Sequence, residues 1–212
     1  MMLSVNRTAY PVTALGPGRR LGLWVQGCSL HCEGCVSADT WDEDLGTYVD
    51  ATELALTVSE LIADEHLDGL TITGGEPLQQ PEALAEFLAA FRGRCGREVG
   101  VLVFTGYEEG DVRDHFGRIT SLVDALVCGP YNASLVQDDG LIASANQTVY
   151  ATTQLGEDSL VDYISSAQRQ LQVHVGESEI VFAGIPKAGD LLKIEEGLLA
   201  RGIEIGGRSW AI

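Results

Sequence analysis

The sequence is poor in positive charge. It has 13 Lys and Arg residues against 31 Asp and Glu residues, which gives a formal net charge of −18. This acidic excess disfavours non-specific binding to nucleic acid and adhesion to anionic membranes, because both depend on basic patches. We therefore expect no nucleic-acid partner and no membrane partner, and we interpret the charge as a well-solvated surface.

Targeting and membrane-spanning patterns are also lacking. The first residues, MMLSVNRTAYPV, have no apolar signal core, and no apolar run approaches the length that spans a bilayer. We therefore expect a cytoplasmic protein. Cytosolic thiols stay reduced, so the five cysteines favour a metal site or catalysis over disulfides.

Apolar runs alternate with helical periodicities over the first two thirds of the chain. Residues 1–20 are expected to be irregular. The predicted strands are 21–26, 69–77, 98–107 and 124–131, and the predicted helices are 52–66, one that starts at Pro81, and a short one that ends near residue 119. This order favours a parallel sheet with helical crossovers, either open or closed into a partial barrel.

The last third of the chain changes character. We predict a strand over residues 146–155 and a hairpin over 171–185 that turns near Gly176-Glu177. A helix over about 188–201 and a final GIEI strand follow, and these elements would extend the sheet. We find no repeat and no linker. We therefore expect one domain over residues 1–212, with a core at about 15–153 and an extension at about 154–212.

Three of the five cysteines, Cys28, Cys32 and Cys35, lie in one loop with the spacing C-x3-C-x2-C. Three thiolates suit a soft metal or a cluster. A structural zinc site needs four ligands, whereas an iron–sulfur cluster with three cysteines leaves one iron open to a substrate or cofactor. A zinc knuckle and buried free thiols are the alternatives. Free thiols suit Cys95 and Cys128 better than the three clustered residues.

A second motif, TITGGEPLQQ, places Gly74, Gly75, Glu76 and Pro77 at the end of a predicted strand. Ligands in α/β sheets gather outside the carboxyl ends of the strands. Glycines expose backbone groups there, and a carboxylate can bind a ligand ammonium. The simpler alternative is an ordinary turn from a strand into a helix.

The segment WVQGCSLHCEGCVSADTW, followed one strand later by GGEP, resembles the radical S-adenosylmethionine (SAM) superfamily. More narrowly, Gln26-Gly27-Cys28 and the Thr40-Trp41 pair resemble the activating proteins of glycyl-radical enzymes, above all the anaerobic ribonucleotide reductase activating family. The resemblance implies a radical SAM partial (β/α) barrel of mostly parallel strands, with a C-terminal α/β extension.

The resemblance also implies cofactors. Cys28, Cys32 and Cys35 would hold a [4Fe–4S] cluster, and the fourth iron would bind SAM. An electron from the cluster would cleave SAM to a 5′-deoxyadenosyl radical, which takes a hydrogen atom from a glycine of a partner glycyl-radical enzyme. A flavodoxin or ferredoxin would supply the electron.

Further site residues follow from the same resemblance. Gly74, Gly75, Glu76 and Pro77 would hold the methionyl amine of SAM. The FTGY segment would place Thr105 on the SAM carboxylate or ribose, and the S-x-N-Q segment would place Asn146 and Gln147 in the SAM or partner cleft. For each of these later segments, an ordinary turn is the alternative.

Two residues depart from the family pattern. Cys128 stands where the family usually has Asp, and Val36 follows the third cysteine where an aromatic residue is common. Together with the long last third, Cys128 gives weight to a radical SAM enzyme that modifies a small molecule or a peptide. A non-catalytic zinc or iron–sulfur module is a third alternative, which the second motif disfavours.

Overall fold

The computed structural model describes residues 1–137, 140–166, 169–175, 180–187, 189–204, 206–207 and 209–210. The strands are β1 (Met2–Val12), β2 (Arg20–Val25), β3 (Thr47–Asp50), β4 (Gly69–Gly74), β5 (Gly100–Thr105), β6 (Ala125–Cys128), β7 (Thr148–Ala151), β8 (Leu171–Val175) and β9 (Ile180–Gly184). The α-helices are α1 (Ala51–Asp64), α2 (Pro81–Cys95), α3 (Glu109–His115), α4 (Gly117–Thr120), α5 (Gln154–Ser166) and α6 (Asp190–Leu199).

A seven-stranded sheet in the order β3-β1-β2-β4-β5-β6-β7 forms the centre of the molecule. The four middle strands β2, β4, β5 and β6 are parallel, and β1, β3 and β7 pair antiparallel outside them. The predicted strands 21–26, 69–77, 98–107 and 124–131 are confirmed as these four middle strands. Helices α1 and α2 confirm the predicted crossovers. The strand order does not test whether the sheet curves into a partial barrel, so the partial barrel stays a prediction.

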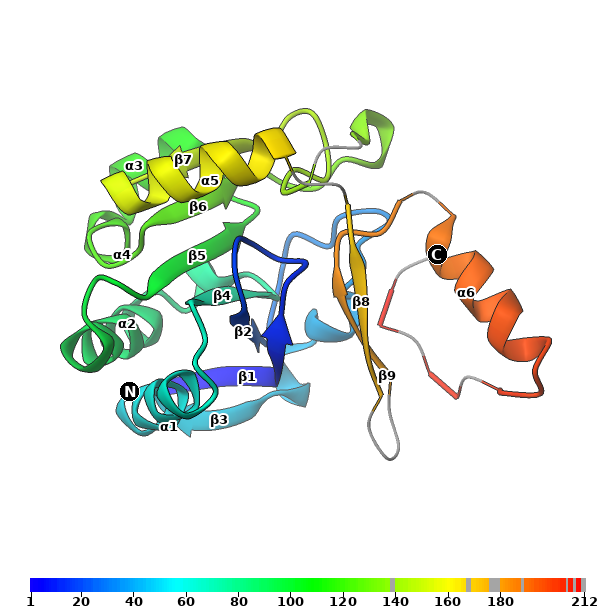
Figure 1. Cartoon of the computed structure of the whole chain (residues 1–212), viewed down its shortest axis with the longest axis horizontal. Coiled ribbons are helices and arrows are strands. Elements are labelled where there is room, and N and C mark those ends of the chain that lie inside the picture. The colour runs from blue at the N-terminus through cyan, green and yellow to red at the C-terminus, as the bar shows by residue number, and fades with distance from the viewer. Residues whose placement is uncertain are drawn as a thin grey trace.

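The two faces of the sheet have different coverings (Figure 1). On one face, α1 and α2 pack against alternate strand residues such as Leu23 and Ile72, and Phe87 and Phe91 of α2 are fully buried there. The opposite face carries Trp24 and Phe104, which contact residues of the C-terminal hairpin, Ala183 among them. This alternation directs neighbouring strand residues to different environments.

The prediction that residues 1–20 are irregular is wrong, because β1 runs over most of them. Its apolar residues Leu3 and Val5 are buried. The polar residues that follow interrupt the apolar pattern for a structural reason: Asn6 donates to the Gln26 side chain, and Arg7 pairs with Asp39. The strand therefore lacks the simple alternation from which strands are predicted.

One prediction for the last third is confirmed only over its centre, as β7, and another is wrong. The predicted strand 146–155 ends at Ala151, and Gln154 already belongs to α5, at whose start the Thr153 hydroxyl accepts a hydrogen bond from Gly156 N. The GIEI strand does not form over residues 202–204, where Gly202 has a φ of +77°; Ile205 lies outside the described residues.

The remaining C-terminal predictions have mixed outcomes. The hairpin is confirmed as β8 and β9, and the helix as α6, although residues 176–179 of the predicted turn lie outside the described residues. The hairpin forms a two-stranded sheet of its own, so it does not extend the main sheet. In the described part of the chain, no helix combines the length and the apolarity needed to cross a membrane.

Candidate functional site

The loop that carries the three cysteines is closed at its neck by backbone hydrogen bonds. Gly27 N donates to Thr40 O over 2.8 Å, and Cys28 N donates to Trp41 O over 3.0 Å. The two residue groups singled out by the sequence, Gln-Gly-Cys and Thr-Trp, are thus the two sides of one neck. The thiols lie on the segment that this neck encloses.

The Gln26 side chain adds further hydrogen bonds to the neck of the cysteine loop. Its side chain is 1% exposed, and Nε2 donates to the carbonyls of Asp39 at 3.0 Å and Asp42 at 2.7 Å. Its Oε1 accepts a hydrogen bond from Asn6 on β1 at 2.6 Å. Asn6 was not predicted from the sequence, because only the fold brings β1 beside the loop.

Cys28, Cys32 and Cys35 are all partly exposed and carry free thiols. Burial raises the pKa of the Cys35 thiol, while the backbone N–H of Ser37 and the indole of Trp41 oppose this shift by hydrogen bonding to the sulfur. The Ser37 N to Cys35 Sγ distance is 3.4 Å. N–H groups aimed at a cysteine sulfur are among the features that tune protein-bound iron–sulfur clusters.

Cys28 has a similar environment. Burial raises the pKa of its thiol, and the backbone N–H groups of Leu30 and His31 oppose the shift by hydrogen bonding to the sulfur. His31 has a φ of +47°, and its ring contacts that of Trp41 in a tilted arrangement with 4.7 Å between the ring centroids. The loop therefore bends its backbone so that N–H groups face the sulfur.

Within the described residues, no three His, Cys, Asp or Glu side chains are arranged to hold a single metal ion. An iron–sulfur cluster places its thiolates on different irons, so its ligands stand farther apart than those of one ion. Three free thiols on one closed loop, two of them with N–H donors on the sulfur, fit a cluster of this kind. They offer three of the four ligands that a closed zinc site requires.

The second motif lies directly against the cysteine loop. Gly75 N donates to Val25 O and Glu76 N donates to Gly27 O, both over 2.8 Å. A Cβ atom on Gly75 would lie 2.3 Å from Gly27 O, and Gly74 has a φ of +101°. Both glycines are required because the two loops approach so closely. The structure thus brings the two sequence motifs together.

The Glu76 carboxylate joins the carboxyl ends of β4 and β5. It is 2% exposed; Oε1 accepts hydrogen bonds from Leu78 N at 2.8 Å and Thr105 Oγ1 at 2.7 Å, and Oε2 accepts one from Gly106 N at 2.7 Å. Burial raises the pKa of Glu76, and these three donors oppose the shift. Pro77 begins the short 3-10 helix that Glu76 caps. Contact of Glu76, Pro77 or Thr105 with SAM stays a prediction.

Asn146 and Gln147 hold the loop beyond β6. Asn146 Nδ2 donates to Pro130 O at 2.7 Å, while its buried Oδ1 has no partner among the described residues. Gln147 donates to Gly129 O and accepts from Ala143 N. Gln147 lines the larger cavity described next and Asn146 does not, so the predicted role of Asn146 in a ligand cleft remains untested.

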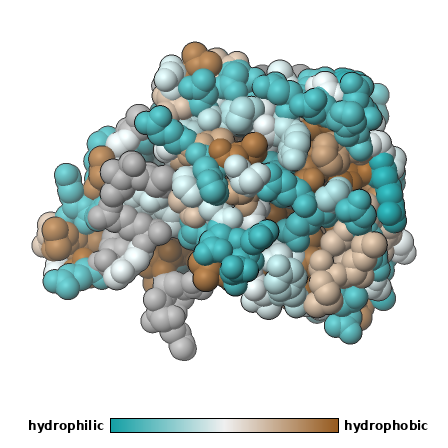
Figure 2. Space-filling model, turned by 180° about the vertical axis from the view of Figure 1, so that it is seen from behind, coloured by the Kyte–Doolittle hydropathy of each residue, from teal (hydrophilic) through white to brown (hydrophobic). Residues whose placement is uncertain are grey.

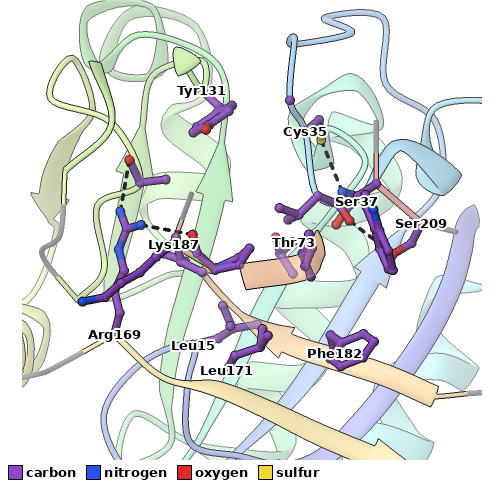
Figure 3. Close-up of a pocket in the computed structure, with 18 of the residues that line it drawn as sticks. Leu15, Cys35, Ser37, Thr73, Tyr131, Arg169, Leu171, Phe182, Lys187 and Ser209 are labelled. Atoms are coloured by element: carbon purple, nitrogen blue, oxygen red, sulfur yellow. Dashed lines mark hydrogen bonds between the residues drawn. The ribbon is translucent and has the colours of Figure 1, made fainter. Parts of the chain in front are cut away.

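A cavity of about 460 Å³ lies beside the cysteine loop, on the sheet face opposite α1 and α2 (Figure 3). One side is formed by the loop and by the ends of β4 and β5, with Gly34, Cys35, Thr73, Gly74 and Phe104. The rest of the lining comes from the segment just after β1, from β2, from the loop between β6 and β7, and from the last third of the chain. A ligand in this cavity would therefore lie next to the third cysteine and the first glycine of GGEP.

Cys128 does not reach this cavity. It ends β6 in register with Thr105 on β5, but its side chain belongs to the core on the helix-covered face, where it is 1% exposed. Burial raises the pKa of its thiol to about 12. A buried thiol of this kind is chemically inert. Val36, the other departure from the family pattern, does line the cavity.

Comparison with known proteins gives consistent matches over the first two thirds of the chain. A family model described as a 4Fe-4S single cluster domain matches residues 14–150. Anaerobic ribonucleoside-triphosphate reductase-activating proteins are similar: that of Enterobacteria phage T4 is 30% identical over 65% of this chain and 87% of its own length. That of Escherichia coli K12 is 30% identical over 66% of this chain and 94% of its own length. That of Pasteurella multocida is 32% identical over 68% of this chain and 96% of its own length.

Among solved structures, the chitinase domain of the spore coat protein CotE from Clostridium difficile matches 74% of this chain and 62% of that chain. The TM-score is 0.31 at 14% sequence identity. Such a low score supports no conclusion about fold or function.

Proposed function

The chain belongs to the family of anaerobic ribonucleoside-triphosphate reductase-activating proteins, and from this membership we propose that it is a radical SAM enzyme that forms a glycyl radical in a partner reductase. Its cofactors are a [4Fe–4S] cluster and SAM. The observation that carries the proposal is the meeting of the two motifs: the closed three-cysteine loop is hydrogen-bonded to the Gly75-Glu76 turn beside a cavity.

Cys28, Cys32 and Cys35 would hold the cluster, and Thr73 and Gly74 form the side of the cavity on which we place SAM. When bound, the cluster and SAM together supply a radical that can take a hydrogen atom. The apolar cavity wall keeps water from this radical. Glu76 fixes the turn that adjoins the cluster loop, through its bonds to the β5 end.

A small redox protein, a flavodoxin or a ferredoxin, supplies the electron in this proposal. The cysteine loop supports it, because Leu30 and Val36 are exposed beside the thiols and give such a donor a surface to approach. We also place the enzyme in the cytoplasm, since a reducing compartment keeps the three thiols free.

The proposal is tested by anaerobic reconstitution with iron and sulfide, followed by reduction with SAM present. The wild-type protein is expected to give 5′-deoxyadenosine, and a glycyl radical by electron paramagnetic resonance when the reductase of the same organism is added. Cys28→Ala, Cys32→Ala and Cys35→Ala should each abolish both products. Cys95→Ala, outside the loop, is the matched control and should keep them.

The outcomes separate the alternatives. A cysteine-loop variant that still cleaves SAM would contradict the assignment of Cys28, Cys32 and Cys35 as cluster ligands. A wild-type protein that cleaves SAM but forms no glycyl radical would favour a small-molecule or peptide substrate. One zinc per chain, with no iron and no cleavage, would favour the non-catalytic module.

A further inference from the structure

Much of the cavity lining comes from residues outside the family match. The match ends at residue 150, yet the lining continues with residues of β8, β9, α6 and the segment before the C-terminus. We call these lining residues the C-terminal wall: Arg169, Leu171, Phe182, Gly184, Ile185, Pro186, Lys187, Gly189, Leu191, Leu192, Ser209 and Trp210. These residues lie outside the part of the chain that the family model matches, and they complete the cavity lining beside that part.

The wall is fixed to the core beside β1. The Gln172 side chain accepts a hydrogen bond from Thr13 N at 2.8 Å and donates to Pro11 O at 2.6 Å, so one amide joins β8 to the end of β1. Ala183 of β9 is fully buried with Trp24. The hairpin of β8 and β9 is therefore packed against the main sheet by these hydrogen bonds and by apolar contact.

Arg169 fixes the wall at a second place. Its guanidinium donates to Ile142 O at 3.0 Å and Ala143 O at 3.1 Å, both in the family-matched part, and to Pro186 O at 3.1 Å in the wall itself. Figure 3 shows Arg169 and Lys187 together at one end of the cavity, away from Cys35. The Arg169 side chain therefore holds the segment after β9 against the loop between β6 and β7.

The wall also touches the cysteine loop. Ser209 O accepts a hydrogen bond from Asp39 N at 3.2 Å, and Ser209 Oγ donates to Val36 O at 3.3 Å. Trp210 packs edge-on against Phe182 at 6.3 Å between ring centroids. The segment that follows the third cysteine is thus in direct contact with the last described residues of the chain.

The chemistry of the wall is apolar with a basic end. Leu171, Phe182, Ile185 and Trp210 contribute apolar surface, and the charged groups among the described lining residues are cations, with no Asp or Glu. This composition is unusual in a chain of net charge −18. The apolar surface of the wall favours an apolar ligand segment.

Resting on the proposed function, we propose that the C-terminal wall is the substrate-selecting side of the active site. It binds the glycine-bearing segment of the partner reductase as an extended, largely apolar peptide, while SAM occupies the opposite side at Thr73 and Gly74. The specificity-determining residues are Phe182 and Leu171, which face the cavity from the paired strands β9 and β8 (Figure 3).

The test compares Phe182→Ala and Leu171→Ala with Leu199→Ala, a control on α6 that is 63% exposed and does not line the cavity. Each reconstituted protein is titrated with the reductase of the same organism and, separately, with SAM. Truncating an apolar anchor should raise the Kd for the reductase by about tenfold or more. The change in the Kd for SAM should be clearly smaller, and the control should match the wild type in both.

Glycyl-radical yield at limiting reductase provides the second readout and should fall with the Kd. Because Phe182→Ala removes packing, its melting curve is recorded, and Phe182→Leu should restore affinity if apolar contact is what matters. Wild-type reductase affinity in both alanine variants, or an equal loss of SAM affinity, would overturn the proposal. A wild-type protein that forms no glycyl radical would overturn the proposed function itself, and with it this inference.

Discussion

The Glu76 carboxylate shows how a motif residue can serve the fold at a position where a ligand contact was predicted. Its oxygens accept hydrogen bonds from Leu78 N, Thr105 Oγ1 and Gly106 N, and it is almost fully buried. Three donors that converge on one buried carboxylate hold the ends of β4 and β5 together. The position is therefore sensitive to the loss of a single acceptor.

Replacing Glu76 by Gln should destabilise the protein by about 2 kcal/mol, because the new amide nitrogen faces N–H or O–H donors and leaves a buried group without an acceptor. The measurement is urea unfolding of the cluster-free protein under anaerobic conditions. Glu60→Gln, an equivalent change on the exposed face of α1, should leave the midpoint unchanged. Equal midpoints for the two variants would show that the Glu76 network adds nothing to stability.

Some site residues were predictable from the sequence and others were not, for a clear physical reason. The cysteines and GGEP are short motifs whose spacing is visible in the chain, and the structure brings them together. Gln26 acts through Asn6, a residue 20 positions away on another strand. No local pattern encodes such a contact. Likewise, Gly74 and Gly75 were predicted to face a ligand; in the structure both also admit the neighbouring chain at close distance, and Gly74 lines the cavity.

At the scale of elements, α1 depends on a charged cap. Asp50 Oδ1 accepts hydrogen bonds from Thr52 N at 2.9 Å and Glu53 N at 3.1 Å. The Glu53 backbone N–H, with that of Thr52, lowers the pKa of Asp50 below its usual 3.8. A carboxyl with a lowered folded-state pKa stabilises the fold above its unfolded pKa and loses this effect as pH falls through the folded value.

Asp50→Ala should therefore lower the urea midpoint at neutral pH, because the first turn of α1 loses its acceptor. The difference from the wild type should shrink as the pH is brought below 3.8. Asp50→Asn keeps a capping oxygen and should lie between the two proteins at neutral pH. A difference that stays constant across this range would mean that ionisation of Asp50 does not contribute.

The elements that the sequence predicted well are those with a regular apolar period. Strands β2, β4, β5 and β6 are buried runs, and α1 and α2 have helical spacing. Strand β1 was missed because Asn6 and Arg7 face partners in the cysteine loop. Helix α5 was missed because the strand-like TVYA segment precedes it closely, and the side chain at its start, Thr153, is β-branched.

At the scale of the whole molecule, the acidic excess is the main electrostatic feature. Hydrophilic residues spread over much of the reverse face in Figure 2. With a net charge of −18, the acidic side chains repel one another, and this repulsion destabilises the compact folded state. Salt screens this repulsion, with a Debye length of about 10 Å at 0.1 M.

The melting temperature should therefore rise as sodium chloride is added from low ionic strength. A double variant, Glu60→Gln with Asp64→Asn, carries two fewer negative charges and should show a weaker salt dependence. Calorimetry or circular dichroism measures both. A melting temperature that falls with salt would mean that attractive pairs, such as Arg7 with Asp39, outweigh the general repulsion.

The neck of the cysteine loop bears on the entropy of cofactor loading. Backbone hydrogen bonds between Gly27 and Thr40 and between Cys28 and Trp41 close a loop of the chain, and the Gln26 side chain adds to them. The conformational entropy of loop closure is therefore lost when the protein folds and not when the cluster is assembled. In small zinc domains the metal must supply that ordering. Here the fold joins the ends of the loop, so the free energy of binding between the cluster and the thiolates does not have to offset the entropy of loop closure.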